Sequence, residues 1–363
     1  MKIHFATDVF SSLLKNIKNI DNIVAIPTNL EKPMYNEYEH LTEQEKICYK
    51  KLLKEAKEYK TEFKFYETTT KTISNAFQAM LTDHPEIFWL SGEGEIEGTY
   101  VNRIVEDATL HASLSPEMEL STIPVMAQIF ESAVSTVVAR AKLCKTTFLQ
   151  VLAVHDYIID STTYDLEAPA RFNAYGCLVQ NRAVCAGYSK AFMLIMNRLG
   201  YRCGYAAGFG RKSGERHAWN YIEIDGEFYH IDVTQDDPTV DDPDYKGDNK
   251  TRDYFCVTTN ELLKTHVISD EFPVPFCGGT KYNYYNYNNR TLACYEFDAV
   301  SEIATPLMKK SGKFSVKFTT IAEADRAFNH LINQRKIYTI PGAARRVLYF
   351  KSRNGLILTI ENN

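Results

Sequence analysis

The pattern of apolar and polar positions predicts helices along most of the first 160 residues. Residues 41–60 read "LTEQEKICYKKLLKEAKEYK", with apolar positions recurring on one face between charged ones, as in an amphipathic helix. The stretch 73–90 predicts a helix that ends at "DHP" and is followed by an apolar strand. The helical pattern returns over 122–160. Together these segments predict a mostly α N-terminal domain over residues 1–140, with a few strands.

A second pattern, over 185–199, predicts a helix whose first residue is a cysteine. Its small and apolar positions recur at intervals of 4, 3, 4 and 3, which places them on one helical face: Cys185, Ser189, Phe192, Met196 and Leu199. Gly200 is suited to end the helix, because glycine readily adopts the left-handed conformation that often follows a helix C-terminus. Cys185 therefore lies in the first helical turn.

The segment "HAWNYIEIDGEFYHIDVT" (217–234) alternates as two strands and predicts a β-hairpin. Asp225 and Gly226 form the kind of two-residue turn that hairpins favour. Ile224 then faces Glu227. If the strands contain no bulge, the residue numbers of every facing pair add up to 451.

In this register His217 and Asp232 are diagonal neighbours on one face of the hairpin. Their Cβ atoms would lie about 7 Å apart, within reach of a side-chain hydrogen bond. His230 points to the same face and competes for the role of base, but it lies beside Asp232 on the same strand. We therefore prefer His217 and expect His230 to be a supporting or half-exposed residue. The other face carries apolar side chains that suit a core: Ala218, Ile222, Ile224, Tyr229, Ile231 and Val233.

Cys185, His217 and Asp232 have the side chains that a thiol-based acyl-transfer site needs. Unpaired backbone N–H groups and the dipole at a helix N-terminus stabilise an anion, so a thiolate is favoured at Cys185. An imidazole can take and return the thiol proton, and a carboxylate can orient that imidazole. The alternative for Cys185 alone is an ordinary core cysteine, because free cysteines are usually buried.

The last 60 or so residues predict a small α+β unit over 301–363. The sequence "KFSVKFT" alternates as a strand, and Thr320 with Glu323 predicts a capping box at a helix start. One face of this helix is apolar: Ile321, Ala324, Phe328, Leu331 and Ile332. The tail ends with a predicted hairpin that turns at Asn354 and Gly355.

Composition narrows the function classes without naming one. The 363-residue chain has a formal charge of −5, which argues against nucleic acid or an anionic membrane as a partner. The sequence has no run of about 18 apolar residues, so a membrane span is not expected. The first 19 residues lack the apolar core of a signal peptide, which predicts a cytoplasmic location unless the chain was trimmed. Eight cysteines occur without a CxxC pair, so we expect reduced thiols and neither a metal site nor a cofactor.

The segment "AVCAGYSKAF…LGYRCGYAAGFG…ERHAWNYIEIDGEFYHIDVTQDDP" resembles the transglutaminase-like superfamily, including its bacterial cysteine peptidases. The similarity extends through "HDYI" (155–158) and "YDLEAPARFNAYGCLV" (164–179) to "DYFCVTTNELLKTH" (253–266). The resemblance implies a papain-related α+β catalytic domain over 141–300. It also implies catalytic roles in the matching positions: Cys185 as nucleophile, His217 as base and Asp232 as the orienting acid.

Three further residues are weaker site candidates. Gln180, five residues before the cysteine, could supply a second oxyanion donor, or it could be a solvent-facing turn residue. Trp219 could form a wall of the substrate cleft or simply be a packed aromatic. Gln235 stands where bacterial relatives tend to carry tryptophan. The resemblance therefore does not define the wall of the substrate cleft near Asp232. The acidic segment 242–253 is close to a calcium loop, but its Lys246 and Asp253 do not fit, so a solvated loop is expected.

These features favour cysteine-dependent acyl transfer on a protein or peptide substrate. Water as acceptor would give a peptidase or amidase, which we prefer, and an amine would give a protein-glutamine transglutaminase. A non-catalytic peptide-binding module on the same fold is the remaining alternative. The sequence indicates neither the substrate nor the oligomeric state.

Overall fold

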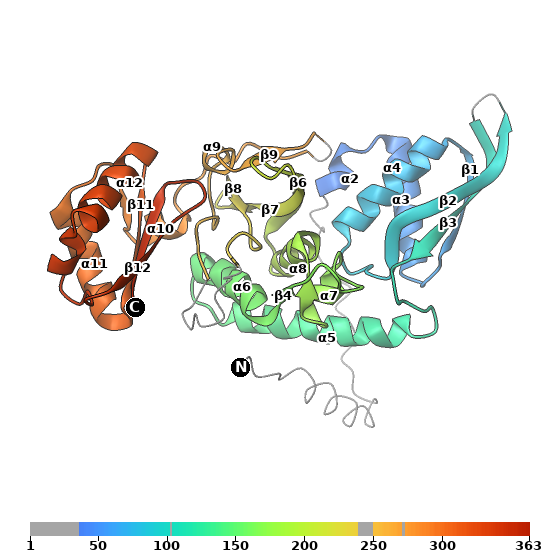
Figure 1. Ribbon diagram of the computed structural model, residues 1–363. Coiled ribbons are helices and arrows are strands. Elements are labelled where there is room, and N and C mark those ends of the chain that lie inside the picture. Colours follow the sequence, from blue (N-terminus) through green and yellow to red (C-terminus); the bar gives the residue numbers. More distant parts are fainter. Residues whose placement is uncertain (1–35, 102–103, 239–249, 271–272) are drawn as a thin grey trace, which may run out of the picture. The chain divides into compact units, whose positions relative to one another are not determined.

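The structure, a computed structural model, describes residues 36–101, 104–238, 250–270 and 273–363 (Figure 1). Residues Met34–Asn363 form one compact unit, which is the part described below. The stretch considered as a signal peptide and most of the segment considered as a calcium loop lie outside the described residues. Among the helices of the described part, none combines the length and the apolar character needed to cross a membrane.

The N-terminal part places helices beside a three-stranded antiparallel sheet with strand order β1-β3-β2. Its elements are α2 (Asn36–His40), α3 (Glu43–Ala56), β1 (Glu62–Thr68), α4 (Thr70–Asp83), β2 (Leu90–Val101) and β3 (Ile104–Leu114). Thr42 and Thr69 cap the two longer helices by accepting hydrogen bonds from backbone N–H groups of the first turn. The helix predicted within 41–60 is confirmed, and so is the helix that begins the stretch 73–90 and ends at "DHP".

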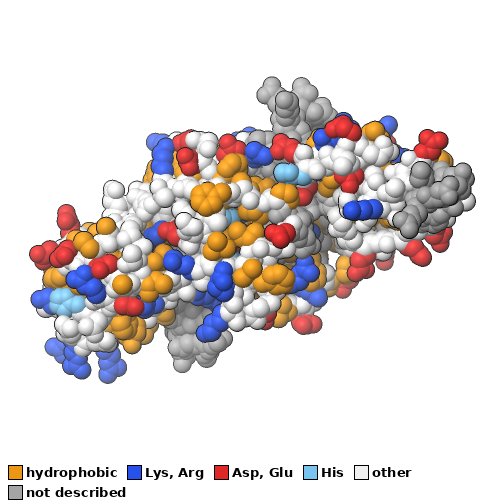
Figure 2. Space-filling model, turned by 90° about the horizontal axis from the view of Figure 1, so that it is seen from above, with side chains coloured by type: hydrophobic (Ala, Val, Ile, Leu, Met, Phe, Trp, Pro, Cys, Tyr) orange, Lys and Arg blue, Asp and Glu red, His pale blue; other side chains and the backbone are white. Residues whose placement is uncertain are grey.

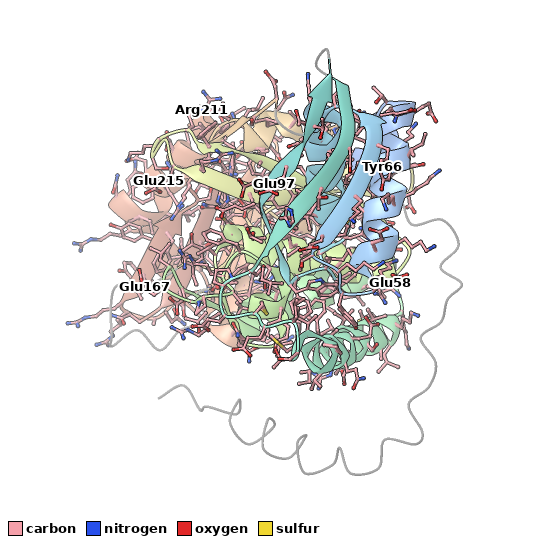
Figure 3. All side chains as sticks on the ribbon, turned by 90° about the vertical axis from the view of Figure 1, so that its right-hand side faces the viewer. Glu58, Tyr66, Glu97, Glu167, Arg211 and Glu215 are labelled. Carbon is pink, nitrogen blue, oxygen red and sulfur yellow. The ribbon has the colours of Figure 1, made fainter. Side chains whose placement is uncertain are left out.

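The strands of this part differ from the prediction. The apolar stretch before residue 90 is buried in an irregular connection, and β2 begins only at Leu90. β1 and β3 were not predicted, because their outer face is polar and charged. Tyr66 and Glu97, labelled in Figure 3, lie on this sheet, and Tyr66 is 64% exposed. Alternation of this kind gives a weak signal when the polar face predominates.

The central part joins four helices to a second sheet with strand order β8-β7-β6-β9. The helices are α5 (Ile123–Lys142), α6 (Thr147–Ser161), α7 (Ala174–Leu178) and α8 (Cys185–Arg198). The strands of the sheet are β6 (Arg202–Gly210), β7 (Arg216–Ile224), β8 (Glu227–Ile231) and β9 (His266–Ile268). Two short strands, β4 (Thr163–Tyr164) and β5 (Arg182–Ala183), pair in parallel just before α8, and α9 (Thr259–Leu262) precedes β9.

The β7–β8 hairpin has the predicted register. Ile224 pairs with Glu227 and Asn220 pairs with Ile231, as the sum of 451 requires. Asp225 and Gly226 both have positive φ, at 52° and 80°, as expected for a turn that matches the twist of a hairpin. Helix α8 packs against this sheet, where the Asn220 side chain donates a hydrogen bond to the Ser189 carbonyl.

The C-terminal part has a third sheet with strand order β10-β11-β13-β12. Its elements are α10 (Tyr284–Tyr287), β10 (Thr291–Leu292), α11 (Phe297–Ser311), β11 (Lys313–Phe318), α12 (Ile321–Phe328), η2 (Asn329–Asn333), η3 (Lys336–Thr339), β12 (Val347–Lys351) and β13 (Ile357–Asn362). The predicted strand and hairpin are confirmed. The capping box is only half formed: Thr320 accepts from the Glu323 N–H, whereas the Glu323 carboxylate accepts from the Tyr295 N–H. Ile321, expected on the apolar face, is 43% exposed.

Two large hydrophobic cores underlie this arrangement. The first contains buried residues from Cys48 to Tyr282, so the predicted N-terminal and catalytic segments share it. The second lies within the C-terminal part, from Tyr295 to Ile360. The mixture of helices and strands confirms the α+β class, and the boundaries at 140 and 300 stay predictions. Acidic, basic and hydrophobic side chains are interspersed on the face seen in Figure 2.

Candidate active site

Cys185 is the first residue of α8, as the helical pattern predicted. The residue before it, Val184, has no side chain that can accept from the first-turn N–H groups. In contrast, α3, α4 and α6 each have a threonine cap. The α8 start therefore leaves backbone donors available for an anion beside the thiol. Cys185 is partly exposed, whereas five of the other seven free cysteines are buried.

A tight backbone contact fixes the position of this helix start. The Val184 N–H donates to the Arg171 carbonyl at 3.0 Å, which ties the segment before α7 to the start of α8. A Cβ atom at Gly187 would lie 2.6 Å from the same carbonyl oxygen, closer than real Cβ contacts allow. Glycine at 187 thus permits the close approach that holds Cys185 in place.

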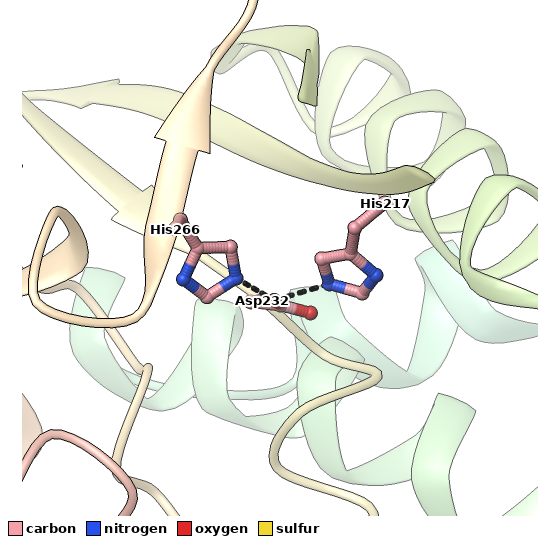
Figure 4. A group of neighbouring side chains, drawn as sticks. All are labelled: His217, Asp232 and His266. Atoms are coloured by element: carbon pink, nitrogen blue, oxygen red, sulfur yellow. Dashed lines mark hydrogen bonds and ion pairs between the residues drawn. The ribbon is translucent and has the colours of Figure 1, made fainter. Parts of the chain in front are cut away.

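His217 and Asp232 meet as the hairpin register predicted. The Nε2 atom of His217 lies 2.7 Å from Asp232 Oδ2 (Figure 4). Because Nε2 is directed to the carboxylate, Nδ1 is the ring nitrogen left to exchange a proton with Cys185. The other carboxylate oxygen, Oδ1, accepts from the backbone N–H of Gln235 at 3.1 Å. Asp232 is fully buried, so its charge depends on these donors.

A second histidine, His266, also binds Asp232 and was not predicted. Its Nε2 atom lies 3.0 Å from the same Oδ2 atom that His217 contacts (Figure 4). His266 is the first residue of β9, which pairs with β6. Its Nδ1 atom lies 2.8 Å from the hydroxyl of Thr265. The similarity segment 253–266 ends at this residue, which was the one signal in the sequence that could have identified it.

The charges at the site favour a protonated His217 and an ionised Asp232. Burial disfavours the imidazolium, but the charge and hydrogen bond of Asp232, with a smaller contribution from Cys185, raise the pKa of His217 to about 10. Burial also disfavours the carboxylate. The charge and hydrogen bond of His217 and the hydrogen bond from His266 nevertheless hold the pKa of Asp232 below its usual range. The two groups form a buried, hydrogen-bonded ion pair.

His230 and Trp219 are buried next to the site, where they contact each other, and they do not line an open cleft. His230 is fully buried and not half-exposed: its Nδ1 accepts from the Trp219 indole N–H at 3.2 Å, and its Nε2 lies 3.1 Å from the Thr259 hydroxyl. Burial, together with the charge of His266, lowers the pKa of His230 to about 3. Trp219 is also fully buried, with its ring stacked beside that of His217 at a centroid distance of 6.1 Å. Of the two interpretations, the structure supports a packed aromatic.

Tyr164 is a second residue that the sequence analysis missed. It pairs with Ala183 in the β4–β5 ladder, and its ring lies 6.3 Å from that of Tyr188, in the first turn of α8. Burial and then the charge of Cys185 raise the pKa of its phenol, and an interaction with the Cys185 backbone N–H opposes this shift. The phenol of Tyr164 is therefore a neighbour of Cys185 at the start of α8.

The remaining sequence candidates lie around this centre. Gln180 is exposed after the end of α7, so its role as an oxyanion donor stays a prediction. Gln235 holds Asp232 through its backbone, while its side-chain oxygen accepts from Arg353 of the C-terminal part. This contact differs from the cleft-wall role considered for position 235.

His217, Asp232 and His266 are also the group of described side chains with ligand atoms close enough to share a metal ion, within 4.8 Å of one another. Both imidazoles already direct Nε2 to Asp232, which accepts from them. A metal would have to replace both N–H donors. The hydrogen bonds therefore favour a proton-sharing cluster.

The model of the transglutaminase-like superfamily matches residues 136–233, which include Cys185, His217 and Asp232. These residues belong to the transglutaminase-like superfamily. The transglutaminase-like segment runs from α5 to just beyond β8, and His266 lies outside it.

Relatives of the transglutaminase-like segment cover limited parts of each chain. Kyphoscoliosis peptidase from Mus musculus is 27% identical over 139 residues, covering 34% of this chain and 20% of that protein. The protein of the same name from Homo sapiens is 26% identical over 143 residues, covering 35% and 21%. The chain thus spans about a fifth of the length of these curated relatives. A solved structure described as a TGase is 14% identical with a TM-score of 0.30, covering 46% of this chain and 49% of that one.

Proposed function

We propose that this protein performs cysteine-dependent acyl transfer on a peptide or amide bond, with hydrolysis as the usual outcome. The observation that carries the proposal is the 2.7 Å contact between His217 and buried Asp232, placed beside a cysteine at an uncapped helix start. The superfamily match to the same segment and the similarity to kyphoscoliosis peptidase support it.

The proposed mechanism uses the two ring nitrogens of His217 for different tasks. The Nδ1 atom holds the proton taken from Cys185, and the resulting thiolate attacks the substrate carbonyl, so that a tetrahedral oxyanion forms. Backbone N–H groups at the α8 start stabilise this oxyanion. His217 then protonates the leaving amine, the C–N bond breaks, and a thioester remains on Cys185. Asp232 holds the ring through Nε2 and stabilises the imidazolium.

Water is the proposed acceptor for the thioester. His217 removes a proton from water, the resulting hydroxide attacks the thioester carbonyl, and the thiol leaves as the carboxylic acid forms. Cys185 is partly exposed, so water can reach it. Transfer to an amine requires a site that excludes water while admitting the amine. We therefore prefer a peptidase or amidase to a transglutaminase.

Selective alkylation tests whether Cys185 is an enzyme nucleophile or an ordinary thiol of a binding module. A limiting amount of iodoacetamide at about pH 6 should modify Cys185 first, because its proton can pass to the adjacent imidazole. His217→Ala should slow this reaction, and exposed Cys294 is the internal control. Peptide mapping by mass spectrometry measures both sites. Equal rates at Cys185 and Cys294 would favour the non-catalytic peptide-binding module.

Substrate profiling separates hydrolysis from amine transfer. A proteome-derived peptide library should be cleaved by the wild type and not by Cys185→Ala. In parallel, a glutamine-containing protein is incubated with a fluorescent primary amine. Efficient labelling that depends on Cys185 would overturn the preference for water as the acceptor.

A further inference from the structure

A cavity of about 160 Å³ lies between the N-terminal sheet and the back of the active-site helix. Its lining includes residues of α4, β2, α8 and β6, elements labelled in Figure 1. Its lining is mixed: Phe88 and Leu90 are among the apolar residues, and the amides of Gln78 and Asn173 are among the polar groups. A cavity of this size has room for several waters or one small organic molecule.

Lys190 supplies the one basic side chain among the cavity-lining residues. It lies on α8, five positions after Cys185, and is partly buried. Among the described residues its ammonium group has no hydrogen-bond or ion-pair partner. Burial lowers its pKa to about 8. A buried lysine usually has a carboxylate partner, because an isolated charge loses its hydration without compensation.

The other lining residues include no acidic group that could serve as this partner. Tyr205 is the other titratable residue in the lining, and the remaining polar groups are amides and the Thr82 hydroxyl. The Gln78 amide already donates to the Gly92 carbonyl at 2.7 Å, and the Asn173 oxygen accepts from the Gly176 N–H at 2.9 Å. The cavity therefore offers one cation that has no acidic partner in the lining.

We propose that this cavity binds a small carboxylic acid as its anion, with the carboxylate paired to Lys190 and a short apolar body against Phe88 and Leu90. A single cation matches a monoanion better than a phosphate dianion, which needs several donors. The apolar residues of the lining favour a ligand that carries hydrocarbon next to its charge. The site is distinct from the proposed active site and does not depend on the chemistry of Cys185.

Calorimetry with matched acids and amides tests this site. Sodium benzoate and butyrate are the probes, and benzamide and butyramide are neutral controls of nearly the same shape. The acids should bind wild type at least tenfold more tightly than the amides. Between pH 7 and pH 9 the affinity of the acids should fall by about tenfold, because a cation with a pKa near 8 is lost over that range. Near pH 8, binding should also take up protons, seen as different heats in buffers of different ionisation enthalpy.

Variants assign the binding to this cavity. Lys190→Met should abolish acid binding, while Lys145→Met, which changes an exposed lysine, should leave it unchanged. A Cβ atom at Gly92 would lie 3.6 Å from Gln78, an ordinary contact, so Gly92→Leu can fill the cavity while Lys190 remains. This second variant should also abolish binding, and Cys185→Ala should retain it. The proposal is wrong if neither acid binds the wild type, or if Lys190→Met binds them equally well.

Discussion

At the scale of single residues, Asp232 is the point on which the proposed chemistry depends. One carboxylate oxygen accepts from two imidazoles and the other from a backbone N–H. A fully buried carboxylate with three donors keeps its charge and its orientation together. Both properties are needed to hold the His217 ring with Nδ1 free for the thiol.

Substitutions in this group should separate the catalytic histidine from its neighbour. Asp232→Asn should lower turnover by roughly 10⁴-fold, as in serine triads, while the fold is retained. His217→Ala should be at least as severe. His230→Ala should have a smaller effect, because His230 contacts Trp219 and Thr259 and not the carboxylate. Turnover numbers on a cleaved peptide measure this order, and a tolerated His217→Ala beside an inactive His230→Ala would contradict it.

His266 should act as a positioning residue. Hydrogen bonds to charged groups contribute about 1.5–3 kcal/mol, so His266→Ala should lower kcat by roughly ten- to a hundredfold. KM should change little, because the residue is 2% exposed and cannot touch the substrate. His266→Gln should recover much of the loss, since its amide N–H can donate to Asp232. Steady-state kinetics of both variants test the idea, which fails if KM changes and kcat does not.

The residues that the sequence predicted correctly are those fixed by local rules. The position of Cys185 followed from helical spacing, and the meeting of His217 with Asp232 followed from the turn at Asp225. His266 lies 34 residues from Asp232 and reaches it only because β9 adds to the edge of β6. No local pattern encodes that pairing. The Tyr164 contact likewise depends on a two-residue ladder that periodicity cannot detect.

At the scale of elements, the β7–β8 hairpin and the segment over α9 and β9 form a layer with buried polar contacts. The Trp219 indole, the His230 ring and the Thr259 hydroxyl form a continuous chain of hydrogen bonds, and Thr259 also accepts from the Cys277 N–H. This chain requires neutral His230, because Nδ1 has to accept a hydrogen bond from Trp219.

The neutral His230 should make the fold sensitive to acid. Its pKa is near 3 when folded and about 6.5 when unfolded, so between these values the unfolded chain binds a proton that the folded chain does not. Stability from this group is therefore present above pH 6.5 and falls as the pH falls, by about 2 kcal/mol between pH 7.5 and 5.0. Urea unfolding should show this slope reduced in His230→Gln, whose amide can keep both contacts. The control, His111→Gln at an exposed site, should unfold with the wild-type slope.

Elements were predicted where one apolar face dominates the pattern. Helices α3, α4 and α8 and the strands of the hairpin belong to this class. β1 and β3 were missed because their apolar face is outnumbered by charged positions. The Thr320 cap was predicted, but Glu323 bonds to Tyr295, a tertiary contact that the local motif does not contain.

At the scale of the whole molecule, a buried cation joins the C-terminal sheet to the central part. Lys317 of β11 is 4% exposed, and its ammonium lies 2.6 Å from Glu261 of α9 and 3.2 Å from the Asn283 side-chain oxygen. Arg353, in the β12–β13 turn, reaches Gln235 next to the proposed active site. The sequence predicted a separate tail unit, but nothing in its pattern indicated these long-range contacts.

Removing this buried cation should destabilise the protein. Lys317→Met leaves the Glu261 carboxylate without its partner, at an expected cost of about 3 kcal/mol in the free energy of unfolding. The double variant with Glu261→Gln should recover part of the loss. Lys281→Met, which breaks an exposed pair with Asp225, is the control and should change stability little. Urea denaturation measures all three, and an equal effect of Lys317→Met and Lys281→Met would contradict the argument.

The contact between β6 and β9 has a consequence for how this sequence can change over evolutionary time. A Cβ atom at Gly208 would lie 1.9 Å from the Val267 carbonyl oxygen, so any side chain at 208 would push β9 away from β6. His266 would then leave Asp232. The two positions, 58 residues apart, should therefore change together: once Gly208 is replaced, His266 no longer contacts Asp232 and is expected to vary. A related sequence with histidine at 266 and no glycine at 208 would need a different course of β9 beside β6.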